Sequence, residues 1–377
     1  MKVAVIAESD ADEPRVAATP ETVKKMVALG ATVAVQEGAG VKSGVLDADY
    51  GAAGAAVAAD PLNDADIVLQ VRRPEGPELS RLKKGAIVIG MMDPYGHENA
   101  VRAMAEAGII AFALELLPRI TRAQVMDVLS SQANLAGYRA VIDAAAEFGR
   151  ALPMMMTAAG TVPATRVFIM GAGVAGLQAI ATARRLGAIV TATDVRPAAK
   201  EQVESLGAKF IAIEDEEFKA AETAGGYAKE MSKEYQAKQA ALVAEHIKKQ
   251  DIVITTALIP GRPAPRLISK DMVASMRAGS VVVDLAVERG GNVEGVSPDA
   301  VTKINGVKIV GYRNVPGRLA ATASSLYAKN VFAFLELLVD KKSKALALNW
   351  DDEIIKATAL TRDGAVVHPS FRPKSAA

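Results

Sequence analysis

Three glycines, Gly171, Gly173 and Gly176, lie between an apolar run over 166–170 and a stretch of helical periodicity over 174–186. This spacing, between a predicted strand and a predicted helix, is typical of a turn that binds the pyrophosphate of a dinucleotide. Gly171 permits the tight turn, Gly173 lets the backbone approach a phosphate, and Gly176 lets helix and strand pack closely. The helix would also offer free N–H groups to the phosphates at its N-terminus. We therefore assign five residues of the turn to cofactor binding: Gly171, Gly173, Val174, Ala175 and Gly176.

An acid, Asp194, stands 23 residues after Gly171, at the end of the next predicted strand. A carboxylate at this place can accept hydrogen bonds from the hydroxyls of an adenosine ribose and would repel a 2′-phosphate. The sequence therefore predicts NAD(H) rather than NADP(H), and we assign Asp194, Val195 and Arg196 to the site. Arg196 keeps NADP(H) open, because a nearby arginine can accommodate a 2′-phosphate. A strand-end aspartate that caps a helix is the plainer structural alternative.

A second polar cluster runs from Arg119 to Gln132. Its arginine, glutamine, aspartate and serine side chains can together hold a carboxamide and ribose hydroxyls through directional hydrogen bonds. The residues concerned are Arg119, Gln124, Asp127 and Ser130. Composition alone favours a plainer interpretation, a surface loop with an N-cap at Ser130 or Ser131.

Two further loops are candidates for the same site. The stretch Thr255–Pro265 follows a predicted strand, and ligands of parallel sheets lie beyond the carboxyl ends of strands. We assign Thr256, Ala257 and Leu258 to cofactor binding, although the prolines also fit a rigid connection. Between Glu214 and Tyr235 the regular pattern lapses, which in so long a connection is typical of a functional lid or of disorder.

These motifs need a scaffold that brings strand ends together, and the rest of the chain predicts one. Short β-rich runs alternate with helical stretches, which favours parallel sheets with crossover helices. In the N-terminal third of the chain a helix is predicted at 20–29, and strands at 2–6, 31–35, 66–71, 86–90 and 108–113. Further along, strands are predicted at 166–170, 189–193, 209–213, 251–255, 280–284 and 308–310.

Two long helices are expected to join these two sets of strands. One covers 130–152 and is ended by Pro153, and the other covers 320–339, returns to the first set and precedes a polar tail. The predicted fold class is α/β, with two Rossmann-like, doubly wound parallel-sheet domains joined by long helices and a cleft between them. The first domain would comprise 1–129 and 319–377, and the second, 130–318, would be the NAD(H)-binding domain.

Composition excludes several kinds of function. A net charge of +1 gives no field that would attract nucleic acid, and the absence of cysteine excludes disulfides and thiolate metal sites. There is no secretory signal and no run of about 18 apolar residues, so we expect a cytoplasmic protein without direct membrane insertion. No metal-ligand spacing and no conventional acid–base site stand out. His246 is expected to be solvated, and Met154–Met156 to pack in a core or an interface.

Several long strings resemble the NAD(H)-binding component of the proton-translocating NAD(P) transhydrogenase family. The resemblance covers essentially the whole chain and is densest from Arg119 to Thr193. The strings that carry it, besides the glycine turn, are Arg122–Gln132, Asn134–Arg139, Met154–Gly160, Glu222–Ala228 and Thr255–Pro265.

The resemblance implies a role for each region. The loop around the nicotinamide and its ribose would be formed by Arg119, Gln124, Asp127 and Ser130. Gln124 would also reach the NADPH-side nucleotide, and Tyr227, beside Gly226, would lie on a mobile loop that closes over NAD(H). The resemblance further implies a homodimer, held at the cytoplasmic face of the inner membrane by an NADP(H)-binding beta subunit and membrane-spanning subunits.

Hydride would then pass directly between NAD(H) and the partner's NADP(H), coupled to proton translocation in the membrane subunits. Activity as an NAD(P)+ transhydrogenase would therefore need those partners. Direct transfer between two nicotinamides needs binding, orientation and exclusion of water rather than a protein proton donor. This explains why the sequence offers no acid–base site.

Alanine dehydrogenase is the chief alternative, since it shares this architecture and the string Arg15–Pro20. That enzyme uses a lysine and a histidine of its first domain, whereas Val71–Pro74 contains no lysine and Ile89–Asp93 no histidine. A 2-oxo acid would therefore lack its proton partner. A third interpretation is a non-catalytic NAD sensor. The polar loop Arg119–Gln132 argues against it, because a sensor need not present a nicotinamide.

Overall fold

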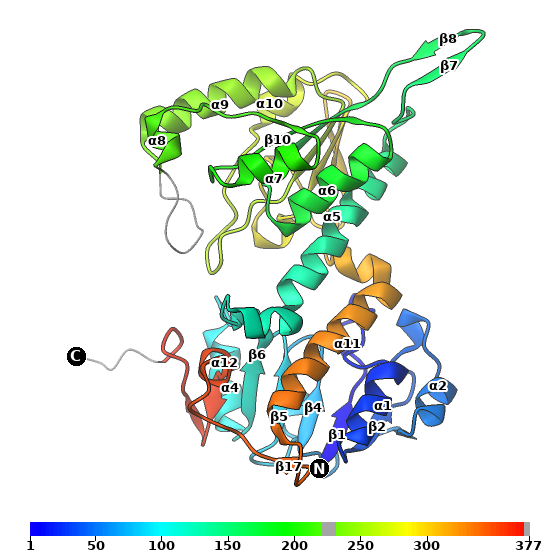
Figure 1. The fold of residues 1–377 in the computed structure, drawn as a ribbon, viewed down its shortest axis with the longest axis vertical. Coiled ribbons are helices and arrows are strands. Elements are labelled where there is room, and N and C mark those ends of the chain that lie inside the picture. Colours follow the sequence, from blue (N-terminus) through cyan, green and yellow to red (C-terminus); the bar gives the residue numbers. More distant parts are fainter. Residues whose placement is uncertain (221–230, 373–377) are drawn as a thin grey trace. The chain divides into compact units, whose positions relative to one another are not determined.

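The chain folds into two units, each a parallel sheet with helices packed on it (Figure 1). The computed structural model describes residues 1–220 and 231–372. The first unit is made of Met1–Gln132 and Pro316–Ala377, and the second of Ala133–Val315. The predicted α/β class with two doubly wound sheets is confirmed. Within the described ranges, no helix combines the length and the apolar character needed to cross a membrane.

The first unit holds six parallel strands: β1 (Lys2–Val5), β2 (Thr32–Gln36), β3 (Ala56–Ala58), β4 (Ile67–Leu69), β5 (Ile87–Gly90) and β6 (Ile110–Ala113). Their order in the sheet is β3-β2-β1-β4-β5-β6, so the direction of strand order reverses between β1 and β4. Its helices are α1 (Pro20–Ala28), α2 (Asp47–Ala52), α3 (Gly76–Leu79), α4 (Glu98–Glu106), α11 (Ala320–Leu337) and α12 (Glu353–Thr358). Short 3₁₀ helices are η1 (Val41–Ser43), η2 (Leu114–Leu116), η3 (Thr121–Met126) and η5 (Val315–Leu319).

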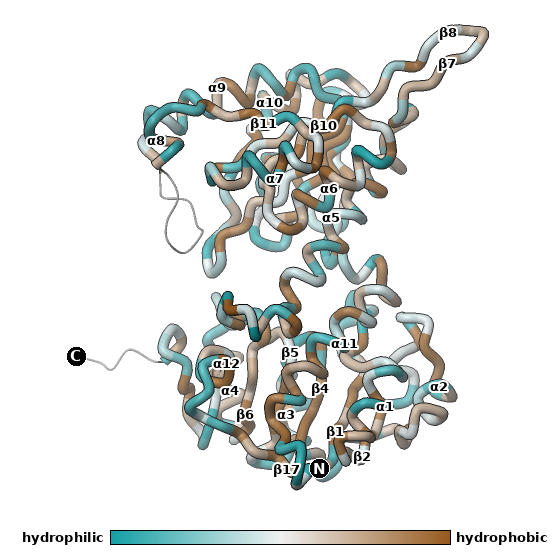
Figure 2. Tube along the Cα trace, in the orientation of Figure 1, coloured by the Kyte–Doolittle hydropathy of each residue, from teal (hydrophilic) through white to brown (hydrophobic). Residues whose placement is uncertain are grey.

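Both faces of this sheet are buried. Alternate residues of a strand point to opposite faces. Val3 and Val5 of β1 therefore join an apolar cluster with Phe334 of α11, while Ala4 joins another with Met104 of α4. Figure 2 shows the central strands as the hydrophobic part of each unit. Burial on both faces is what makes parallel strands read as continuous apolar runs.

The second unit repeats this plan with seven strands: β9 (Arg166–Met170), β10 (Ile189–Thr193), β11 (Lys209–Phe210), β12 (Ile252–Thr255), β13 (Val281–Asp284), β14 (Val301–Ile304) and β15 (Val307–Val310). The order is β11-β10-β9-β12-β13-β15-β14, and only β14 runs antiparallel to its neighbour. Its helices are α6 (Val174–Arg185), α7 (Ala199–Ser205), α8 (Glu216–Lys219), α9 (Lys233–Ile247), α10 (Lys270–Ala274) and η4 (Val287–Arg289). On β9, Val167 and Ile169 pack with Ile180 of α6, while Phe168 packs with Ile247 of α9.

The long helix α5 (Val128–Glu147) begins in the first unit and continues into the second. It ends five residues before the predicted Leu152. Lys308 Nζ donates to the carbonyl oxygen of Glu147 at 2.7 Å, which satisfies one of the last helical acceptors, and Gly149 follows directly. Pro153 was therefore the wrong stop signal. The predicted strand at 209–213 is also shorter, because β11 ends at Phe210.

The segment after α11 is not the polar tail that the sequence suggests. It forms α12 and two hairpins, β16 (Val339–Asp340) with β17 (Ala345–Leu346) and β18 (Thr361–Arg362) with β19 (Ala365–Val366). Ile354, Leu360 and Phe371 are buried in the first unit. The return of this segment to the first unit, expected from the sequence, is confirmed.

Two side-chain expectations were wrong. Met154–Met156 belong to an exposed hairpin, β7 (Met155–Thr157) with β8 (Gly160–Val162), so these methionines are not core residues. His246 is half-buried rather than solvated. Its Nε2 lies 2.9 Å from Thr191 Oγ1 and its ring packs edge-on against Phe168, and burial lowers its pKa.

Candidate functional site

The glycine turn follows β9 and leads into α6, as the sequence predicts. Gly171 has a φ of +104°, which is left-handed backbone that favours glycine. A Cβ on Gly171 would lie 2.5 Å from Thr256 Oγ1, and one on Gly176 would lie 1.8 Å from the carbonyl oxygen of Gly171. A Cβ on Gly173 would meet nothing within 4 Å, so the backbone there borders open space. Two glycines are thus required by packing, and the third leaves its backbone accessible.

The N-terminus of α6 is suited to an anion. Gly173 is its N-cap residue, and no side chain caps the first turn. The N–H groups of Val174 to Gly176 therefore point outward with the positive end of the helix dipole. Helix α5 packs closely behind this turn, because a Cβ on Gly137 would lie 2.0 Å from the carbonyl oxygen of Ala175. A dinucleotide pyrophosphate fits this combination of free donors and open backbone.

Asp194 follows β10 and lies beside the turn. Its Oδ2 accepts a hydrogen bond from the Ala172 N–H at 2.7 Å, which fixes the carboxylate against the glycine turn. Arg196 forms an ion pair with the same carboxylate: Nε lies 2.9 Å from Oδ1, and Nη2 lies 3.1 Å from Oδ2. The Asp194 side chain is only 8% exposed, whereas that of Arg196 is 30% exposed. Val195 between them is exposed. The turn and the acid are thus brought together, with Arg196 covering the acid.

The loop after β12 completes this edge of the sheet. Thr256 Oγ1 donates to the carbonyl oxygen of Gly171 at 3.1 Å, which ties the loop to the glycine turn. Ala257 makes two hydrogen bonds with one buried side chain, since its N–H donates to Asn292 Oδ1 and its carbonyl accepts from Asn292 Nδ2. Leu258 is exposed. The three predicted residues therefore lie where two strand ends meet, held from behind by Asn292.

Sequence reasoning missed Asn292, which is fully buried. The signal that could have found it is the pair Gly290-Gly291 just before it, since both glycines have positive φ and mark a sharp turn. Asp284, also fully buried, accepts hydrogen bonds from the N–H groups of Ala286 and Val293 and so holds the same turn. Burial raises the pKa of Asp284.

The two sheets differ at the point where strand order reverses. In the second unit this point lies between β9 and β12, whose following loops are the glycine turn and residues 256–258. In the first unit it lies between β1 and β4, and Glu8 fills it. The Glu8 carboxylate accepts from the N–H groups of Val71 at 2.6 Å and Arg72 at 3.0 Å, and burial raises its pKa to about 8. Because those donors are used, the second unit is the one suited to a phosphate.

In the first unit, the polar segment 119–130 includes η3 and the start of α5. Asp127 Oδ1 accepts from the Ser130 N–H at 2.9 Å and Oδ2 accepts from the Ser130 hydroxyl at 2.5 Å. Asp127 therefore caps α5, and the N-cap that composition placed at Ser130 or Ser131 was wrong, since both lie inside the helix. Arg119 and Gln124 are exposed, and the structure brings neither into contact with the Asp127–Ser130 pair. Gly226 and Tyr227 lie outside the described residues.

The first unit also contains the region that would matter for an amino-acid dehydrogenase. Arg72 Nε donates to buried Glu13 at 2.9 Å, and Arg15 binds the same carboxylate through Nε and Nη2 at 2.7 Å each. Arg73 Nη1 donates to the carbonyl oxygen of Met92 at 3.3 Å. The cations at this sheet edge are thus held by an acid and a carbonyl of their own unit.

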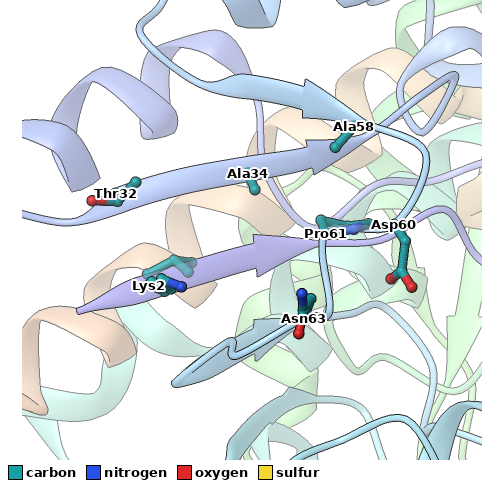
Figure 3. Close-up of a pocket in the computed structure, with 8 residues that line it drawn as sticks. Lys2, Thr32, Ala34, Ala58, Asp60, Pro61 and Asn63 are labelled. Atoms are coloured by element: carbon teal, nitrogen blue, oxygen red, sulfur yellow. The ribbon is translucent and has the colours of Figure 1, made fainter.

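Figure 3 shows a hollow elsewhere in the first unit, with a volume of about 190 Å³. It is lined by β1, β2, β3 and the loop after β3, through Lys2, Val3, Thr32, Ala34, Ala58, Asp60, Pro61 and Asn63. Ligand pockets usually measure about 300–1,000 Å³, so this hollow is too small for a dinucleotide. Among residues 1–220 and 231–372, no group of three or more His, Cys, Asp or Glu side chains could hold a metal ion.

Comparison with known proteins gives a consistent result. The N-terminal domain of the alanine dehydrogenase/PNT family matches residues 4–136, and its C-terminal domain matches residues 140–369. The first of the separately encoded pieces of the NAD(P) transhydrogenase alpha subunit of Rhodospirillum rubrum is 55% identical over 100% of both chains. The crystal structure of transhydrogenase from Sinorhizobium meliloti matches with a TM-score of 0.90 and 63% identity, over 97% of this chain and 100% of that one. An alanine dehydrogenase of Halomonas elongata is 30% identical over 98% of this chain and 95% of its own.

Proposed function

This chain belongs to the alanine dehydrogenase/PNT family, as the first alpha-subunit component of an NAD(P) transhydrogenase, and from that premise we propose that it binds NAD(H) and exchanges a hydride with NADP(H) on a partner subunit. The predicted resemblance to this family is thereby confirmed. One observation carries the proposal for NAD(H): an uncapped helix N-terminus, a glycine turn and a nearly buried Asp194 converge at the strand-order reversal of the second unit.

The residues of the second unit would divide the work of binding. The N–H groups of the glycine turn would bind the pyrophosphate, and Asp194 would accept hydrogen bonds from the adenosine ribose. Arg196 covers Asp194 and would have to yield one side of the carboxylate to the ribose. The loop of Thr256, Ala257 and Leu258 would line the cofactor, because it is tied to the glycine turn.

The nicotinamide end would be held by the first unit's polar segment: Arg119, Gln124, Asp127 and Ser130. When bound, the nicotinamide supplies the hydride or receives it. Asp127 and Ser130 already form one hydrogen-bonded pair, which is a fixed acceptor and donor for a ribose or a carboxamide. Gln124 is exposed and would reach the partner's nucleotide. No proton donor is needed, so these residues bind, orient and exclude water.

The names of the relatives also bear on partners. A relative that is named as one piece of an alpha subunit implies other subunits, and we propose an NADP(H)-binding beta subunit and membrane-spanning subunits that couple hydride transfer to proton translocation. We propose in addition that the chain is a homodimer, peripheral on the cytoplasmic face of the inner membrane through those subunits.

Oxidation of alanine is the less supported function. The arginines near the alternative site are engaged with Glu13 and with the carbonyl oxygen of Met92. The nearby histidine, His97, has its Nδ1 2.9 Å from the carbonyl oxygen of Asp93. A 2-oxo acid would meet no lysine there to share its proton.

The two functions are separated by a pair of assays. The purified chain is mixed with its NADP(H)-binding partner, and reduction of an NADP+ analogue by NADH is followed; the chain alone is assayed with alanine, pyruvate and NAD(H). We expect transfer in the mixture and none with alanine. Turnover of alanine or pyruvate by the chain alone, with no transfer in the mixture, would reject the transhydrogenase function.

A further inference from the structure

The segment that carries Gln124 has little internal support. η3 (Thr121–Met126) is a 3₁₀ helix of six residues, whereas such helices rarely exceed three or four because their hydrogen bonds are poorly aligned. Its apolar residues Ala123 and Met126 are buried, but Gln124 and Val125 between them are exposed. Something outside the segment must therefore hold the backbone on either side of Gln124.

We propose that Asn330 of α11 is a positioning residue for hydride transfer, because its amide fixes the end of η3; this inference rests on the proposed function. Asn330 Nδ2 donates to the carbonyl oxygen of Val125 at 2.8 Å. Asn330 Oδ1 accepts from the Ser131 hydroxyl at 2.7 Å. One side chain thus ties the residue after Gln124 to the first turn of α5, which carries Ser130.

The setting of Asn330 makes this pair of contacts costly to lose. The side chain is 9% exposed and lies on a helix whose neighbouring Val331 and Phe334 are fully buried. A buried amide without partners is unfavourable by roughly 1–3 kcal/mol, so a polar residue at such a position is retained when its partners satisfy it. Here the partners are one backbone carbonyl and one hydroxyl, both in the polar segment.

A second contact holds the other end of η3. Arg122 donates to both carboxylate oxygens of Asp352, with Nη1 2.7 Å from Oδ2 and Nη2 3.1 Å from Oδ1. Asp352 also accepts from the Ile354 N–H and so caps α12, which fixes the carboxylate. The C-terminal segment of the chain therefore holds η3 at Arg122 and at Val125, and Gln124 lies between these two points.

The test compares Asn330→Leu with Ser324→Ala. Asn330→Leu removes both contacts at similar side-chain volume, and Asn330→Asp, which keeps the acceptor for Ser131, serves if the leucine variant does not fold. Ser324 is a matched control, since it is a buried polar residue of the same helix that accepts from the Val16 N–H rather than from η3. Each full-length variant is mixed with the NADP(H)-binding partner subunit.

We expect both Asn330 variants to slow single-turnover hydride transfer at least about tenfold, because small displacements of reacting groups can cost about a hundredfold. The dissociation constant for NADH should change by less than about twofold, since the glycine turn is untouched. Ser324→Ala should leave transfer unchanged. A wild-type transfer rate in Asn330→Leu, or an equal loss in Ser324→Ala, would overturn the inference, and so would a loss of NADH affinity that matches the loss of rate.

Trypsin separates this inference from the proposed function. The bonds after Arg119 and Arg122 lie in the held segment, so Asn330→Leu should be cleaved there faster than the wild type, and Ser324→Ala should not. If the wild-type mixture transfers no hydride, the proposed function fails while this readout still tests the role of Asn330. If cleavage at these bonds is unchanged in Asn330→Leu, Asn330 does not fix η3.

Discussion

Asp194 has two roles that a single carboxylate must share. It braces the glycine turn through the Ala172 N–H, and it forms the ion pair with Arg196. In the proposed complex it would also accept from the ribose. The sequence predicted the acid from its spacing alone, but could not predict that Arg196 covers it, because that contact depends on a side-chain conformation.

Asp194→Asn should therefore weaken the preference for NADH over NADPH. The amide keeps one acceptor oxygen, loses the charge that repels a 2′-phosphate, and releases Arg196 to meet that phosphate. Hydrogen bonds to charged groups are worth about 1.5–3 kcal/mol, so we expect the ratio of the two dissociation constants to fall by at least about tenfold. Fluorescence titration with both nucleotides measures it. An unchanged ratio would mean that another group reads the ribose.

Glu115 is a second residue whose environment makes a prediction. Burial raises its pKa to about 7, and one of its carboxylate oxygens has no hydrogen-bond partner. The folded state therefore binds the Glu115 proton more tightly than the unfolded state. This contribution to stability is fully present below the unfolded pKa of about 4.5 and is lost as pH rises through 7.

Glu115→Gln should remove this part of the pH dependence. Each pKa unit is worth about 1.4 kcal/mol, so the variant should exceed the wild type in free energy of unfolding by up to roughly 3 kcal/mol at pH 8, and equal it near pH 4.5. Urea unfolding from pH 4.5 to 8 measures the difference. Glu106→Gln, an exposed residue of α4, is the control and should follow the wild type. A Glu115→Gln curve parallel to the wild type would refute the assignment.

At the scale of elements, the glycine turn depends on close packing of α5 and α6. The sequence predicted β9 and β10 to the residue, since buried parallel strands bounded by turn signals are well marked. It missed the end of α5 because the cap at Glu147 comes from Lys308, 161 residues away. It also missed the short hairpins and α12, which have too few residues for a clear period.

Gly137→Ala tests the contact between these helices. A methyl group there would lie 2.0 Å from the carbonyl oxygen of Ala175, so α5 must shift from the turn or the turn must move. Such overpacking costs about 1–3 kcal/mol, and we expect both a lower free energy of unfolding and weaker NADH binding. Gly149→Ala, where a Cβ would meet nothing within 4 Å, should change neither. Equal behaviour of the two variants would mean that the turn does not need this contact.

For the whole molecule, the same strand order occurs twice with different outcomes. Both units reverse direction next to their first strand, but Glu8 takes the backbone donors at that place in the first unit, and a glycine turn leaves them free in the second. Composition and alternation of elements predicted both sheets. The filling of one edge could not be predicted, because Glu8 and Val71 meet only in the folded chain.

The central claim is that hydride moves directly from a cofactor on this chain to one on a partner. Its most direct test uses NADH with deuterium at the transferred position of the nicotinamide, the purified chain, and the NADP(H)-binding partner subunit with NADP+. We predict that the NADPH formed retains the deuterium and that the chain or the partner alone gives no transfer. NADPH that carries solvent hydrogen instead, or transfer without this chain, would contradict the account.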